Sequence, residues 1–198
     1  MKTITTILLV LTILGLNAQE KFSVGLQVEG IRSTPKNLSY SSTIESGFGT
    51  GVGIYVSHVI YKSFSANTGL NYRFIQYNHF DKSIGYQTSS KPFDGYQYNQ
   101  NYLVVPLNLR KSFFNEKLFI ETGLELNWIL GRENKKPKSE ILWKIGAGSK
   151  LGKLNYSLNY IWGNNEQSDV LISGTNVKFV NYSSRLLQLK VSYLLWQK

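Results

Sequence analysis

The feature that most constrains this chain is an alternation of apolar and polar side chains that recurs along almost its whole length. In residues 117–131, for example, Leu118 and Ile120 lie on one face, and Glu121 and Gly123 lie on the other. A period of two residues is typical of β-strands that have one apolar and one polar face. The alternation predicts eight strands, at residues 21–32, 46–58, 63–77, 99–113, 117–131, 141–151, 153–163 and 184–196.

The connections between these predicted strands alternate in length. Short turns are expected near residues 59–62, 114–116 and 152, and long loops are expected at residues 33–45, 78–98, 132–140 and 164–183. Each strand has about the length of a transmembrane β-strand or slightly more, and barrels of the outer membrane combine short periplasmic turns with long external loops. The sequence therefore predicts an all-β fold, an eight-stranded antiparallel up-and-down transmembrane β-barrel, with both termini on the periplasmic side.

The first residues have the layout of a secretory signal peptide. A positively charged start at Lys2 precedes an apolar run over residues 4–16, and the small residue Ala18 precedes the expected cleavage site. We therefore expect a signal peptide at residues 1–18 and one barrel domain at residues 19–198. Export of a barrel predicts a location in the outer membrane of a Gram-negative bacterium.

Alternation alone leaves open which face of the strands is inside. A soluble lipocalin-like barrel also has eight strands, with its apolar face around a ligand. Lipid interfaces favour belts of aromatic residues, and aromatic residues occur at both ends of the apolar faces. The belt at the loop ends comprises Trp128, Trp143, Trp162, Tyr72 and Phe74, and the belt at the turn ends includes Phe64, Phe113, Tyr156 and Tyr193. These belts favour an apolar face that points outward to lipid.

Glycine occupies every second position in the segment Gly47–Gly53. The spacing does not match the G-x-G-x-x-G motif of dinucleotide-binding proteins, and no helical pattern follows it. Glycine on the polar face is expected where space is short. We therefore place the run on the inward face, where it makes room for neighbours such as Tyr55, Arg110 or Glu121.

The lumen of an eight-stranded barrel is just wide enough to be filled by side chains. The alternation places a set of charged residues inside, which we expect to form a polar network of ion pairs, because a buried unpaired charge is costly. A two-residue hairpin at 115–116 would put Arg110 directly opposite Glu121. Pro106 also points inward. Proline removes one ladder hydrogen bond and argues against a central strand, a conflict that a β-bulge at this position would relieve. The predicted lumen network comprises Arg73, Arg110, Glu121, Glu125, Lys144 and Lys190.

The sequence carries little reactive chemistry. It has no cysteine and two histidines, and the predicted loop pair of His79 and Asp81 is too small a group to indicate catalysis. We expect no catalytic residue, no metal and no cofactor. The net charge of +10 does not indicate nucleic acid binding, because the chain is exported and the charges do not form one basic stripe.

Aromatic and amide side chains gather in the second long loop. They suit binding of a glycan or a protein, although a hairpin that packs its own tyrosines would have the same composition. The residues concerned are Tyr86, Phe93, Tyr96 and Tyr98. Outer-membrane lipid and lipopolysaccharide are the expected partners. The basic third loop, which contains Arg132, Lys135, Lys136 and Lys138, suits contact with lipopolysaccharide phosphates, although a solvated positive loop would have the same composition.

The segment 101–110, N-Y-L-V-V-P-L-N-L-R, resembles the Y-L-x-x-P-L-x-L-+ strand of the PorT-like outer-membrane β-barrel domain family of Bacteroidota-type bacteria. The segments 120–124, 145–148 and 17–19 are similar to the same family. The resemblance implies an eight-stranded outer-membrane barrel in which Pro106 is an expected feature. It implies no established catalytic residues. The C-terminal Lys198 departs from the terminal aromatic residue common in such barrels.

These observations favour a non-enzymatic integral outer-membrane β-barrel with a polar, side-chain-filled lumen. Two other functions stay open at this point. One is an outer-membrane enzyme that modifies lipid or lipopolysaccharide, and the other is a soluble barrel that binds an apolar ligand.

Overall fold

The structure is a computed structural model that describes residues 22–37, 42–44, 46–81, 96–130, 139–163, 167–173 and 176–198. The predicted signal peptide, residues 1–18, lies outside the described residues. Eight long strands form the barrel: β1 (Phe22–Ser33), β4 (Gly47–Tyr61), β5 (Phe64–Asp81), β6 (Tyr96–Phe113), β7 (Leu118–Leu130), β8 (Ser139–Leu151), β9 (Leu154–Gly163) and β12 (Arg185–Gln197).

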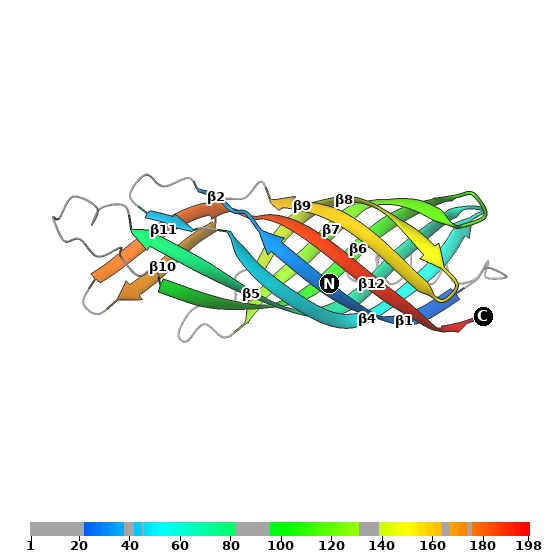
Figure 1. Cartoon of the computed structure of the whole chain (residues 1–198), viewed down its shortest axis with the longest axis horizontal. Helices are drawn as coiled ribbons and strands as arrows, with labels where there is room; N and C mark the ends of the chain where they lie inside the picture. Colours follow the sequence, from blue (N-terminus) through cyan, green and yellow to red (C-terminus); the bar gives the residue numbers. More distant parts are fainter. Residues whose placement is uncertain are drawn as a thin grey trace, which may run out of the picture.

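Each barrel strand pairs in antiparallel fashion with its neighbours in the chain. The ladder runs from β4 through β5 to β9 by adjacent hairpins, and the pairings of β1 with β4 and with β12 close it. Figure 1 shows the strands wrapped obliquely around the long axis of the barrel. The predicted eight-stranded up-and-down barrel is confirmed, and each predicted strand overlaps an observed one.

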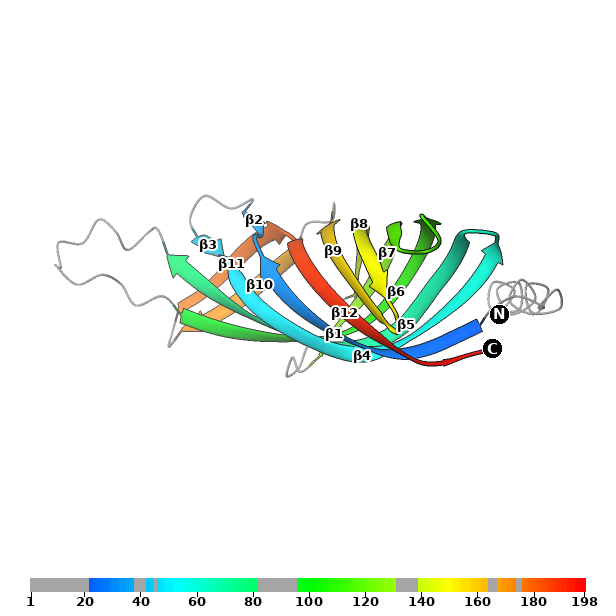
Figure 2. The same ribbon diagram turned by 45° about the vertical axis from the view of Figure 1, so that its right-hand side comes forward.

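Three short turns lie at one end of the barrel, as expected. The turn after β4 has Lys62 at a φ of 44°, the turn after β6 has positive φ from Phe114 to Glu116, and the turn after β8 has Gly152 at 60°. Ser23 on β1 pairs with Gln197 on β12, so the first and last described strands begin and end together (Figure 2). The turn after β6 is longer than a two-residue hairpin, but it keeps the predicted register, because Phe113 pairs with Leu118.

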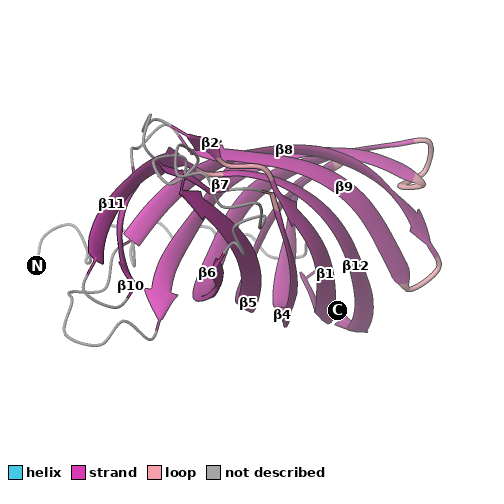
Figure 3. Cartoon of the chain, turned by 60° about the vertical axis from the view of Figure 1, so that its left-hand side comes forward, coloured by secondary structure: helices cyan, strands magenta, loops and turns pink. Residues whose placement is uncertain are grey.

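The long connections contain more strand than the sequence analysis expected. The predicted loop 164–183 holds a hairpin of β10 (Gln167–Ser173) and β11 (Asn176–Ser183), and β11 pairs with β2 (Lys36–Asn37). The short strand β3 (Ser42–Ile44) pairs with the end of β5. Figure 3 shows β10 and β11 at the end opposite the short turns. The backbone N–H and C=O groups of chain segments that extend beyond the barrel still need hydrogen-bond partners, and the pairing of these additional strands supplies them.

Pro106 lies within β6 without a β-bulge. Pro106 pairs with Glu125 on β7 without a register shift, and the register between β5 and β6 is the same on both sides of it. The ladder to β5 instead lacks pairings at Gly69 and Leu70, which lie opposite Pro106 and Val105. A missing N–H therefore interrupts one ladder without displacing the strand.

The two faces of the barrel wall have opposite character. Outward side chains are mainly apolar and exposed, whereas most inward side chains are buried and many of these are polar. Among the residues that the structure describes, no helix has the length and apolarity needed to cross a membrane. The inward side chains of the eight barrel strands are therefore where polar chemistry is concentrated.

Candidate functional site

Glu121 on β7 is the centre of a buried ion cluster in the lumen. Its Oε1 atom lies 2.7 Å from Nζ of Lys190 and 3.0 Å from Nζ of Lys144, and its Oε2 atom lies 2.9 Å from Nη2 of Arg110. The predicted pairing of Arg110 with Glu121 is therefore present in the structure, together with two lysines from β8 and β12. The guanidinium of Arg110 also lies over the ring of Phe119, 3.7 Å from its centroid.

Arg73 on β5 forms a second cluster. Its Nε donates to Oε1 of Glu29 at 2.8 Å, and its Nη1 lies 3.0 Å from Oε2 of Glu125. Glu125 is also 3.9 Å from Nζ of Lys144, so the two clusters meet at that lysine. The side-chain amide of Gln188 donates to Oε2 of Glu29. All six charged residues predicted for the lumen thus lie in one continuous network.

The glycine run on β4 provides the space for this network. Gly51 lies between Glu29 on β1 and Arg73 on β5 in the strand ladders, and a Cβ atom built on Gly51 would overlap the Glu29 side chain. Gly53 is covered by Asn71 and Gly49 by Ile75 in the same way. The inward position of the run matches the expectation, but its expected neighbours were wrong.

Tyr55 was one of those expected neighbours, and its ring instead packs against Gly25 on β1. Arg110 and Glu121 were the others, and they face each other from β6 and β7. No atom of Arg110 or Glu121 is among the three atoms nearest to a Cβ built on any glycine of the run. Which inward residues meet depends on how neighbouring strands are staggered around the barrel. The alternation along a single strand shows which residues point inward, but it does not show this stagger.

An apolar layer fills part of the lumen, where a wholly polar lumen was expected. It is a cluster of buried side chains in which Val104, Leu142 and Ile161 have no exposed surface. The layer comprises Ile31, Ile75, Tyr77, Tyr102, Val104, Ile129, Leu142, Ile161, Tyr182 and Leu186. Most of these residues come from the loop-end halves of their strands, so the layer separates the ion clusters from the loop end of the barrel.

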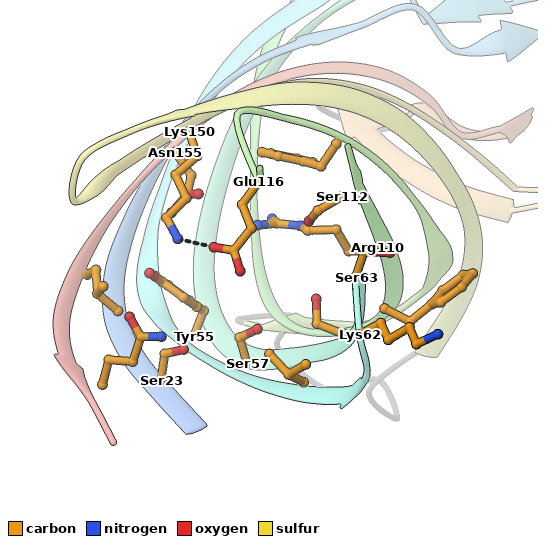
Figure 4. Close-up of a pocket in the computed structure, with 16 residues that line it drawn as sticks. Ser23, Tyr55, Ser57, Lys62, Ser63, Arg110, Ser112, Glu116, Lys150 and Asn155 are labelled. Atoms are coloured by element: carbon orange, nitrogen blue, oxygen red, sulfur yellow. Dashed lines mark hydrogen bonds and ion pairs between the residues drawn. The ribbon is translucent and has the colours of Figure 1, made fainter. Parts of the chain in front are cut away.

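A small cavity lies in the lumen at the turn end. Its volume is about 80 Å³, and Tyr55, Arg110 and several serines line it (Figure 4). Lys150 reaches across this end and donates from Nζ to Oε2 of Glu116 at 2.7 Å. A second cavity deeper in the lumen measures about 20 Å³, which leaves room for little more than a water molecule.

The predicted belt residues lie on the outward face of the barrel. Near the loop ends, Trp143 pairs with Trp162, whose ring stacks on Tyr160 at a centroid distance of 5.6 Å. At the turn ends, Phe22 meets Trp196 edge-to-face at 6.2 Å. The predicted belt residues with large exposed surfaces are Trp128, Trp143, Tyr72, Phe64, Phe113, Tyr156 and Tyr193, and Phe74 and Trp162 are partly exposed.

The side chains of the four aromatic loop residues lie outside the part of the chain that the structure describes. Tyr86 and Phe93 lie outside the described residues, as do the basic residues of the third loop. Tyr96 and Tyr98 belong to β6, where their backbones pair with His79 and Tyr77 on β5. Their side chains lie outside the described part of the chain.

Three lumen residues were missed by the sequence analysis. Glu29 and Gln188 complete the Arg73 cluster, and Glu140 is buried next to Leu142 on β8. The signal was available, because Gln27, Glu29 and Ile31 share the inward parity of β1. Within the described ranges, no group of three His, Cys, Asp or Glu side chains is placed to hold a metal ion.

Comparison with known proteins relates the chain to solved outer-membrane barrels. No family model matches the sequence, and no curated protein sequence matches it. The outer membrane protein OprG from Pseudomonas aeruginosa superimposes with a TM-score of 0.52 at 8% identity, over 89% of this chain and 96% of OprG. Ail of Yersinia pestis, in complex with the heparin analogue sucrose octasulfate, gives 0.46 at 10% identity, over 89% and 99% of the two chains.

Neisserial surface protein A gives a TM-score of 0.46 at 11% identity, over 87% of this chain and 97% of that protein. Identities this low are informative about the fold alone. The similarity to OprG, together with the closed eight-stranded ladder, shows that this chain has the fold of a small outer-membrane β-barrel.

Proposed function

We propose that this protein is a non-enzymatic integral barrel of the outer membrane that acts through its external end and not as a pore. The outward apolar face and its two aromatic belts support insertion in a bilayer. The expected signal peptide at residues 1–18 and the resemblance to the PorT-like family of Bacteroidota belong to the same proposal. So does binding of a glycan or protein partner by the external loops.

The filled lumen is the observation that carries this proposal. Two linked ion clusters occupy its middle, and the apolar layer lies between them and the loop end. A buried pair is strongly resistant to separation, because loss of one partner leaves an uncompensated charge. None of the described cavities in the lumen exceeds about 80 Å³, and the two that lie deeper measure about 20 Å³ or less.

Two pairs of measurements test this function, one of membrane insertion and one of the closed lumen. The protein in isolated membranes should resist extraction by carbonate. The purified folded protein should shift its gel mobility on boiling, as folded outer-membrane barrels do. In planar bilayers of phosphatidylcholine it should give no steady conductance, and vesicles that contain it should not swell in small sugars. Release by carbonate would contradict membrane insertion, whereas a stable ohmic channel would contradict the closed lumen.

A further inference from the structure

The charges on the outer wall of the barrel are all of one sign among the described residues. Four carboxylates of the eight barrel strands have side chains that the structure describes, and these four, Glu29, Glu121, Glu125 and Glu140, are all buried inside the barrel. The charged side chains that point outward from these strands are instead Arg32, Lys111 and Arg185. A cation on a lipid-facing wall needs an anionic partner or water, and the described side chains of the wall offer no carboxylate.

Three cations gather at the loop end of this wall. The backbone N–H of Thr34 donates to the carbonyl of Arg185 at 2.8 Å, so the two residues lie opposite each other on adjacent strands. Arg32 and Lys36 are two residues to either side of Thr34, which makes them diagonal neighbours of Arg185. None of the three forms an ion pair with another described residue.

A niche on the outside of the wall joins two of these cations to belt residues. Its volume is about 460 Å³, the largest of the described cavities, and Lys36 and Arg185 line it together with Ile145, Tyr160 and Trp162. Its remaining described lining residues are Gly163 and Ser183, so none of the described residues that line it carries a carboxylate. We define the cationic niche by Lys36, Arg185, Ile145, Tyr160 and Trp162. Its lining therefore combines two basic side chains with an apolar floor of one aliphatic and two aromatic side chains.

We propose that the cationic niche, with Arg32 beside it, binds a phosphate group of a phosphorylated glycolipid of the lipid A type in the outer leaflet. Ammonium and guanidinium groups bind phosphate by charge-assisted hydrogen bonds, and the apolar floor suits the acyl chains of the same molecule. The inference rests on the proposed function, because insertion in the outer membrane puts the loop end at the outer leaflet. The residues of this site differ from those of the basic third loop.

The test compares lipids that differ only in phosphate. The folded full chain is incubated in detergent with bisphosphorylated lipid A, dephosphorylated lipid A or phosphatidylglycerol, and the retained lipid is counted by native mass spectrometry. The wild type should retain bisphosphorylated lipid A selectively. Each removed cation should weaken retention about fivefold, and the triple variant Arg32→Gln, Lys36→Gln, Arg185→Gln should weaken it roughly hundredfold.

Lys111→Gln is the matched control, because Lys111 is an outward cation at the turn end, where its Nζ donates to Oγ of Ser63 at 2.7 Å. It should retain lipid A like the wild type. Equal retention of the three lipids by the wild type, or full retention by the triple variant, would overturn the proposal. If the triple variant does not fold, the proposal is tested by the single variant Arg185→Gln, which should retain about fivefold less lipid A, and by the comparison of the three lipids with the wild type. Failure of the wild type to insert in vesicles would instead contradict the proposed function.

Discussion

Arg73 and Glu29 form an ion pair across an intervening strand, directly above Gly51. Glu29 on β1 and Arg73 on β5 both pair with Gly51 on β4, and their side chains meet with Nε 2.8 Å from Oε1. Two residues that are two strands apart make this contact only because the residue between them has no side chain. The glycine run is thus part of the charge network.

Gly51→Ala should destabilise the barrel, because the new Cβ would overlap the Glu29 carboxylate and displace it from Arg73. Overpacking of this kind costs about 1–3 kcal/mol. The measurement is urea unfolding in lipid vesicles, followed by the boiling-dependent gel shift. Gly30→Ala is the control, since a Cβ on Gly30 meets no atom within 4 Å. Equal stability of the two variants would mean that the lumen above Gly51 is not crowded.

Glu121→Gln should cost more stability than Glu125→Gln. Glu121 has three cationic nitrogens within 3.0 Å, whereas Glu125 has Arg73 at 3.0 Å and Lys144 only at 3.9 Å. Removal of the Glu121 charge leaves Lys144 and Lys190 facing each other, and the loss of a buried partner typically costs about 3–5 kcal/mol. Unfolding in urea measures both variants. A larger loss for Glu125→Gln would contradict the central position of Glu121.

Leu142→Ala should destabilise the protein more than Ile141→Ala. Leu142 is fully buried in the apolar layer, so its truncation leaves a cavity and costs about 2–5 kcal/mol. The adjacent Ile141 is half exposed on the outer wall, where lipid chains fill the space that truncation leaves. The free energies of unfolding in vesicles give the comparison. The opposite order would place the apolar layer on the wrong face of β8.

Single cysteines should reveal the orientation in the membrane, since the natural chain has none. Thr34→Cys lies at the loop end and Lys153→Cys in the turn between β8 and β9, and both positions are exposed. A maleimide that does not cross membranes should label Thr34→Cys on intact cells and should label Lys153→Cys only after the outer membrane is permeabilised. Labelling of Lys153→Cys alone on intact cells would reverse the proposed orientation.

The sequence predicted the strands, the inward and outward faces and one local pair. Arg110 and Glu121 lie on neighbouring strands joined by a short turn, so the turn sets their register and made that contact predictable. The pair of Arg73 and Glu29 depends on the stagger between β1, β4 and β5, with a long connection between β1 and β4. No short segment encodes that stagger, because it is set by closure of the whole barrel.

The apolar layer was missed for a different reason. Ile75 and Leu142 have inward parity, but a polar lumen was assumed along the full length of each strand. The strands β10 and β11 were likewise not predicted, because with 7 and 8 residues they are shorter than a strand that crosses a bilayer. Residues 170–172 and 177–180 do contain β-branched and aromatic side chains.

The bond from Gln188 to Glu29 joins the last barrel strand to the first, across 159 residues of sequence. Neither edge of the ladder is covered until β12 has been synthesised and has met β1. The lumen network is therefore incomplete in any chain that lacks its C-terminal segment. In such a chain the ion pair of Glu29 and Arg73 would lack the hydrogen bond that the side-chain amide of Gln188 donates to Glu29. Assembly must keep both unpaired edges apart from other chains until this seam forms.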